Sequence, residues 1–115
     1  MTIQNALITN TFLGYEDHGI LTFSLGLDGG GCYVGYGHRA LDEYSEKLEK
    51  RVPVDKSLAC IAEVLNVVGV KKWEDLKGKY VRVESHGLGG SVTKIGHIIE
   101  DKWLDLDEFF SKERQ

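Results

Sequence analysis

The sequence has 115 residues, of which 42% are hydrophobic and 28% are charged. This length suits one domain with a single core, and the composition excludes wholesale disorder. The formal net charge is -4 and the pI is about 5.5, which disfavours nonspecific binding to duplex nucleic acid because such binding needs a basic face. We therefore expect one domain over residues 1–115 that makes no direct contact with duplex nucleic acid.

The cysteines and the absence of a targeting segment indicate a cytoplasmic protein. No apolar run approaches the ~20 residues that span a bilayer. Residues 1–5 lack the basic and apolar regions of a secretory signal. The two cysteines, Cys32 and Cys60, have neither metal-type spacing nor the number typical of a disulfide framework. We expect reduced, buried thiols and no membrane contact.

Three strands are predicted in the first third of the chain. Apolar and small or polar residues alternate over residues 21–27, the period of a half-buried strand. Glycines 29–31 predict a turn, and the alternation over residues 32–37 predicts a hairpin partner. An earlier strand is predicted over residues 3–13, followed by a turn at Gly19, where glycine can take a positive φ.

A helix is predicted over residues 55–68. Its apolar residues recur with helical spacing, and this stripe should lie on the sheet: Leu58, Ile61, Ala62, Leu65 and Val68. Asp55 is the expected N-cap and Gly69 the expected residue after the C-cap. The charged, uneven stretch before it, residues 42–51, predicts a loop or a short exposed helix.

The last third predicts two more strands and a short helix. Residues 73–76 are predicted to form a helical turn ended by Gly78, and strands follow over 80–84 and 92–99. Residues 104–110 suggest a short C-terminal helix or an irregular docking segment. The sequence therefore predicts an α+β fold with an antiparallel sheet of about five strands. The 55–68 helix and the C-terminal helix should cover one face, and the other face should be polar and aromatic.

No catalytic or metal-binding pattern stands out. Residues 35–40 fit the relaxed dinucleotide fingerprint G-x-G-x-x-A, but that motif works inside a parallel βαβ unit, whereas an antiparallel hairpin is predicted here. No nucleophile elbow is present. The histidines lack metal-ligand spacing: His18, His38, His86 and His97. We expect no enzyme, no metal and no cofactor.

Cations beside aromatic residues form the candidate binding site. Arg82 and Lys94 are expected on the same side of one hairpin, with Arg82 pointing away from the helix and free for a partner. The predicted binding residues are Arg39, Arg82, Lys94, Tyr36 and Tyr80, with Tyr33 nearby. Cations beside rings can hold a phosphate and stack a base or a partner side chain. The alternative is ordinary solvent-facing charge that protects an exposed sheet.

Four segments carry a resemblance over nearly the whole chain. They are FLGYEDHGILT (12–22), YGHRALDEY (36–44), WEDLKGKYVRV (73–83) and IGHIIEDKW (95–103). Together they resemble a family of small proteins encoded by phages and prophages of gut and related bacteria. Small phage proteins of this type include inhibitors of bacterial immunity, some of which block CRISPR effectors while others bind cyclic nucleotide signals.

This resemblance implies a viral accessory protein that acts by binding. The first hypothesis is a non-enzymatic inhibitor of a host defence complex, such as a CRISPR nuclease of the Cas9 type. The second is a sponge for a cyclic nucleotide or cyclic ADP-ribose immune signal, and the third is a small enzyme acting on such a nucleotide. Because a fold of this kind can associate through its sheet or sheet edges, we expect a homodimer or larger homo-oligomer.

Overall fold

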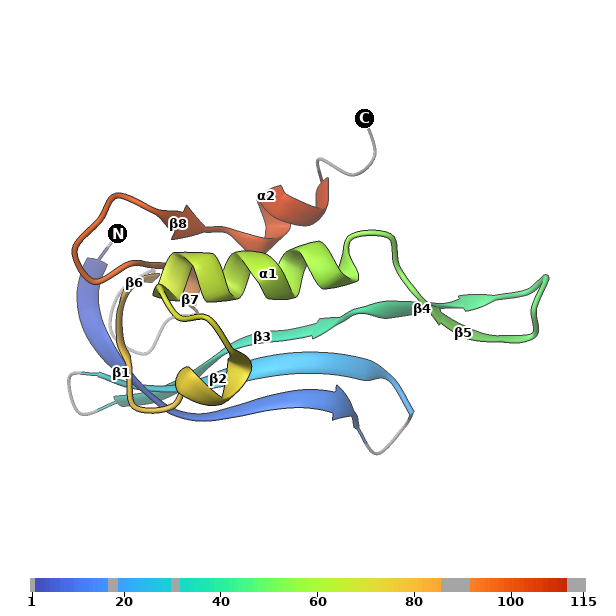
Figure 1. Cartoon of the computed structure of the whole chain (residues 1–115), viewed down its shortest axis with the longest axis horizontal. Coiled ribbons are helices and arrows are strands. Elements are labelled where there is room, and N and C mark those ends of the chain that lie inside the picture. The colour runs from blue at the N-terminus through green and yellow to red at the C-terminus, as the bar shows by residue number, and fades with distance from the viewer. Residues whose placement is uncertain (1, 17–18, 30–31, 86–91, 112–115) are drawn as a thin grey trace.

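The alternating residues of the first third form long strands of an antiparallel sheet (Figure 1). The computed structural model describes residues 2–16, 19–29, 32–85 and 92–111. In chain order, the elements are β1 (Thr2–Tyr15), β2 (Leu21–Gly29), β3 (Cys32–Ala40), β4 (Asp42–Ser45), β5 (Lys50–Pro53), α1 (Ser57–Val68), the 3₁₀ turn η1 (Trp73–Asp75), β6 (Tyr80–Ser85), β7 (Val92–Gly96), β8 (Trp103–Leu104) and α2 (Leu106–Ser111).

The main sheet consists of two antiparallel meanders that meet at β1. Its strand order is β3-β2-β1-β6-β7-β8. The 14-residue strand β1 pairs with β6 from Thr2 to Leu7 and with β2 from Leu7 to Tyr15. A bulge between Ile8 and Asn10 lies next to this exchange of partners. Because a bulge bends its strand and increases the local twist, it allows one strand to serve both halves of a curled sheet.

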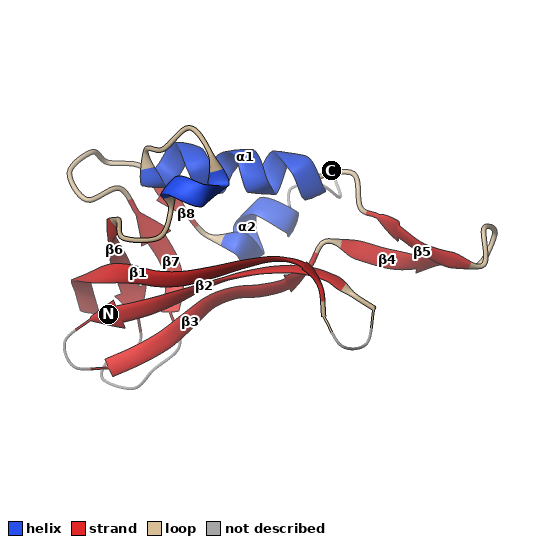
Figure 2. Cartoon of the chain, turned by 60° about the horizontal axis from the view of Figure 1, so that its bottom comes forward, coloured by secondary structure: helices blue, strands red, loops and turns tan. Residues whose placement is uncertain are grey.

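Both α helices cover the same face of this sheet, as predicted (Figure 2). The inward residues of the strands and one side of α1 form a continuous core that includes Ile8, Phe23, Leu25, Val81, Val83, Ile95, Cys60 and Val64. The α+β class and the antiparallel sheet are therefore confirmed. The main sheet has six strands rather than about five, because the two-residue strand β8 is too short to leave an alternating pattern.

The predicted stripe of α1 is wrong by one position. The buried residues of α1 are Ser57, Cys60, Val64, Val67 and Val68, whereas Leu58 is 81% exposed and Ile61 and Leu65 are only partly buried. Apolar residues occur on nearly every side of this helix, so two neighbouring stripes had helical spacing. The expected cap at Asp55 is also wrong, since Lys56 is the N-cap and makes no side-chain capping bond. Gly69 does end the helix, with φ of 91°.

Truncating two residues of α1 tests this register. Val64→Ala should lower the free energy of unfolding by about 2–3 kcal/mol because it removes fully buried methyl groups. Leu58→Ala should change it by less than about 0.5 kcal/mol. Chemical denaturation of both variants measures the difference, and equal losses would contradict the observed register.

Residues 42–53 form a β-hairpin, not the predicted loop or exposed helix. Strands β4 and β5 pair with each other in a separate two-stranded sheet and extend away from the rest of the molecule (Figure 1). This hairpin, hereafter the arm, lies along the long axis of the molecule, whose extents are 46 × 32 × 29 Å. Its charged residues gave no alternation of apolar and polar types, so the strand signal was missing from the sequence.

A tyrosine joins the two edge strands of the main sheet across its interior. The Tyr36 hydroxyl, on β3, donates a hydrogen bond of 2.8 Å to the carbonyl oxygen of Leu104, on β8. Tyr36 is only 5% exposed. Burial raises the pKa of its hydroxyl well above the usual value of about 10. The hydroxyl therefore stays protonated and closes the curl of the sheet.

Removal of this hydroxyl should lower the unfolding free energy and should also reduce the loss of stability at alkaline pH. Tyr36→Phe leaves the Leu104 carbonyl without its donor and should cost about 1–3 kcal/mol of unfolding free energy. In the original protein, stability should also fall as the pH rises above about 10, because the unfolded tyrosine ionises while the folded one does not. Urea denaturation from pH 8 to 11 should show a smaller alkaline loss in Tyr36→Phe. A loss of the same size in both proteins would contradict this role.

Candidate functional site

Arg82 and Lys94 lie on the same side of the β6–β7 hairpin, as predicted, and both face Trp103. The Arg82 guanidinium carbon is 4.8 Å from the centre of the Trp103 ring and the Lys94 ammonium is 5.8 Å from it. The indole packs directly over Gly96, where a Cβ atom would lie only 2.6 Å from Trp103 Cε3. Glycine is therefore required at position 96 for the ring to reach both cations.

Arg82 points away from the core, as predicted, and its guanidinium is engaged with the backbone. Its Nε donates to the carbonyl oxygen of His97 at 2.7 Å and its Nη2 donates to that of Glu100 at 2.8 Å. Lys94 lies 3.6 Å from the Glu84 carboxylate. Both side chains therefore have partners within the chain, and Arg82 holds the turn that connects β7 to β8.

His97 fixes the same turn through its ring. Its Nδ1 accepts hydrogen bonds from the backbone N–H groups of Ile99 at 3.0 Å and Glu100 at 2.9 Å. Both bonds use Nδ1 as the acceptor, so this one nitrogen holds two backbone N–H groups of the turn. This histidine is a structural residue, and within the described ranges no group of His, Cys, Asp and Glu could hold a metal ion.

Substitution separates the structural role of Arg82 from that of Lys94. Arg82→Ala leaves two backbone carbonyls without a charged donor and should lower the unfolding free energy by about 1–2 kcal/mol. Lys94→Ala removes only a partly exposed ion pair and should cost less than about 1 kcal/mol. Both cations face Trp103, so thermal unfolding followed by tryptophan fluorescence compares them directly. Equal losses would show that stacking, not hydrogen bonding, is the main contribution of Arg82.

Arg39 belongs to a different part of the molecule. A bulge in β3 places Arg39 opposite Phe23 while Gly37 lies opposite Ser24, so position 38 is the extra residue. Gly37 has φ of 99°, a conformation that glycine favours. The shift turns Arg39 to the face that carries the helices. There it pairs with Asp107 of α2 at 2.7 Å and lies 4.8 Å from the Phe110 ring centre.

The predicted tyrosines Tyr36 and Tyr80 lie in different environments. Tyr36 is buried in the core, so its ring offers little surface to a partner. Tyr80, at the start of β6, is 57% exposed and remains a candidate. The Tyr33 side chain lies outside the described part of the structure. The five predicted residues therefore form no single site.

Cys60 fits its expected role as a small buried residue. It is fully buried, and burial raises the pKa of its thiol to about 12. Since the thiolate is the reactive form, this thiol is not a nucleophile near neutral pH. The Cys32 side chain is outside the described residues.

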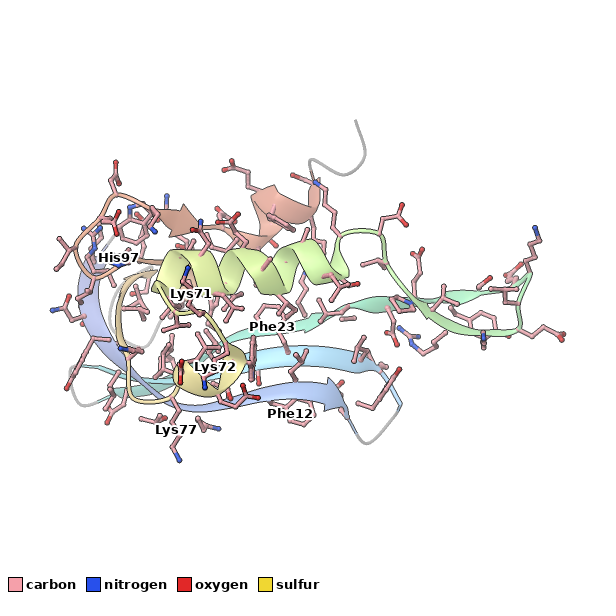
Figure 3. The ribbon with its side chains drawn as sticks, in the orientation of Figure 1. Phe12, Phe23, Lys71, Lys72, Lys77 and His97 are labelled. Atoms are coloured by element: carbon pink, nitrogen blue, oxygen red, sulfur yellow. The ribbon has the colours of Figure 1, made fainter. Side chains whose placement is uncertain are left out.

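Sequence reasoning missed a group of lysines between α1 and β6. Lys71, Lys72 and Lys77 project from this segment, and His97 lies at the same end of the molecule (Figure 3). Two adjoining hollows, hereafter the lysine groove, are formed there. The larger, of about 680 Å³, is lined by Asn5, Val68, Gly69, Gly78, Lys79, Tyr80, His97 and Ile98. The smaller, of about 460 Å³, is lined by Gly69, Val70, Lys71, Glu74, Asp75, Lys77 and Lys79.

The backbone fixes this groove to β1. The Gly78 N–H donates to the Ile8 carbonyl oxygen at 2.8 Å, and the Ile8 N–H donates to the Lys79 carbonyl oxygen at 2.9 Å. The short turn η1, which was predicted, lies between the lysines. The sequence signal was the lysine density of residues 71–79, but it lies outside the strands in which cations were sought.

The arm is held rigidly at its base by a buried carboxylate. Asp42 accepts hydrogen bonds from Arg51 Nε at 3.0 Å, from Arg51 Nη2 at 2.8 Å and from the Leu21 N–H at 3.1 Å. These bonds, chiefly those from the Arg51 guanidinium, hold the pKa of the Asp42 carboxyl below its usual value. Farther along the arm, Tyr44 and Leu48 are 57% and 56% exposed.

No family model matches this sequence, and no sufficiently similar curated protein was found. The phage-family resemblance of the four segments therefore remains a prediction. Within the described ranges, no helix has both the length and the apolar character needed to cross a membrane.

Proposed function

We propose that this protein is a non-enzymatic phage or prophage accessory protein that inhibits a bacterial defence complex by binding it. A CRISPR nuclease of the Cas9 type is the first target to test. The arm is the proposed contact element. The phage-family resemblance supports the biological setting, and the exposed residues of a fixed, projecting hairpin support protein binding as the mode of action.

The arm carries this proposal because it presents apolar residues away from the body of the molecule. An exposed tyrosine and an exposed leucine lie on an element of twelve residues, between β4 and the end of β5. Aromatic side chains are enriched among the residues that dominate binding energy at interfaces. The charged residues around them, Glu43, Glu46, Lys47 and Glu49, are exposed and suit the polar rim of an interface.

The rigid base of the arm would favour tight binding. Asp42 and Arg51 fix the hairpin to β2 before any partner arrives. A contact element that is already ordered loses less conformational entropy on association than a free loop would. The arm can enter a cleft on a large complex without any rearrangement of the sheet.

The experiment is a cleavage assay and a complex-formation assay with a panel of defence nucleases. The protein should lower cleavage by its target and elute with it on size exclusion. Tyr44→Ala should weaken the complex by about 2 kcal/mol, or roughly thirtyfold in the dissociation constant. Tyr44 is exposed, so the variant should remain folded.

Leu58→Ala is the matched control because Leu58 is an exposed apolar residue outside the arm. It should bind and inhibit like the original protein. Unchanged cleavage and no complex across the panel would sink the proposal. Inhibition that Tyr44→Ala and Leu48→Ala both preserve would move the contact away from the arm.

A further inference from the structure

The lysine groove combines positive charge with few internal partners. Lys71, Lys77 and Lys79 line the smaller hollow and are exposed. In the part of the chain that the structure describes, these lysines make no ion pair and no side-chain hydrogen bond, unlike Arg39, Arg82 and Lys94. Three ammonium groups around one hollow repel one another, and a bound anion relieves that repulsion. Lysine is a common phosphate ligand in proteins.

Two carboxylates oppose this charge. Glu74 and Asp75 line the same hollow as the lysines. The hollow therefore carries one net positive charge from three lysines and two acids. This arrangement suits a compact phosphate held by the ammonium groups, with the acids limiting its affinity. It does not suit a long polyanion, which would need a continuous basic surface.

The larger hollow is lined by both apolar and hydrogen-bonding side chains. Tyr80, which is 57% exposed, lines this hollow, and Val68 and Ile98 add apolar lining. The exposed Asn5 side chain has both hydrogen-bond donors and an acceptor. Exposed aromatic rings stack on nucleobases, and an amide can bond to the polar edge of a base.

Glycine keeps the two hollows connected. Gly69 and Lys79 line both hollows. A Cβ atom at Gly69 would lie 3.0 Å from Nε2 of His97, which lines the larger hollow, so a side chain there would crowd the groove. Lys79 and Tyr80 are adjacent in sequence at the start of β6. One ligand can therefore reach the lysines and the tyrosine together.

We infer that the lysine groove binds a free nucleotide, with its phosphates beside Lys71, Lys77 and Lys79 and its base against Tyr80. The volumes of about 680 and 460 Å³ lie in the range of roughly 300–1,000 Å³ that small-molecule sites occupy. This site is independent of the arm, and either can exist without the other.

Calorimetry with the full chain at low salt tests the ligand class. The probes are ADP, GDP, CDP and UDP, with inorganic pyrophosphate and the corresponding nucleosides as references. At least one nucleoside diphosphate should bind at least about tenfold more tightly than pyrophosphate or its own nucleoside, because stacking on an aromatic ring contributes roughly 1–3 kcal/mol. Binding should weaken as salt is raised.

Matched lysine variants test the phosphate side. Lys77→Ala should weaken nucleotide binding by about tenfold, the usual effect of losing a charge-assisted hydrogen bond. Lys72→Ala is the control, since Lys72 is exposed on the same segment but lines neither hollow. It should change affinity by less than about threefold. Glu74→Gln should tighten binding, a gain that misfolding cannot produce.

Tyrosine variants test the base side. Tyr80→Ala should weaken nucleotide binding while leaving pyrophosphate binding unchanged, and Tyr80→Phe should restore it because stacking needs only the ring. No binding of any nucleotide would overturn the inference. Pyrophosphate binding as tight as nucleotide binding, equal losses in Lys72→Ala and Lys77→Ala, or preference for a single-stranded oligonucleotide would overturn it equally.

Discussion

Both halves of the main sheet depend on β1, because this strand alone pairs with β2 on one side and β6 on the other. The bulge after Ile8 bends it between the two partners. At the same place Ile8 exchanges hydrogen bonds with Gly78 and Lys79, so the start of β6 and the lysine groove are fixed to the bend. The shape of one strand therefore sets the curl of the sheet, the space that α1 fills and the position of the candidate nucleotide site.

The curl also explains why the strand cations have partners within the chain. It brings the edge strands β3 and β8 close enough for Tyr36 to bridge them. The segments 97–102 and 106–111 provide the acceptors for these cations: the backbone carbonyls of His97 and Glu100, and the carboxylate of Asp107. Arg82 holds the first segment and Arg39 holds the second. Arg82 and Arg39, which were predicted to meet a partner, thus connect residues 97–111 to the sheet.

The fold class could be predicted from the sequence because alternation and helical spacing are local properties. Val81 and Val83 point inward and Arg82 points outward, as their alternation indicates. The local spacing of residue types was insufficient where a bulge or a second apolar stripe determined which side chains face the core. The bulge in β3 turns Arg39 toward the helices, which strand alternation alone does not indicate. Helix α1 has two apolar stripes, of which the one containing Val64 fits the sheet.

The candidate sites were harder to predict for a related reason. Arg82 has the same sequence environment whether it faces solvent or a turn fifteen residues away, and only the fold brings His97 within reach. The lysine groove likewise requires Asn5 of β1 to lie beside a segment more than sixty residues later. Neither of these long-range contacts affects the local spacing of residue types, so neither could be predicted from it.

The two proposed binding surfaces lie at opposite ends of the molecule, and α1 runs between them (Figure 1). The helix begins soon after the arm and ends at Gly69, which lines the groove. Twelve residues at about 1.5 Å each separate its ends by roughly 18 Å. Substitutions at sites farther apart than about 7–10 Å usually have additive effects when they share no partners. The buried side of α1 packs into the core between the two surfaces, so substitutions in the groove and in the arm should have additive effects on stability.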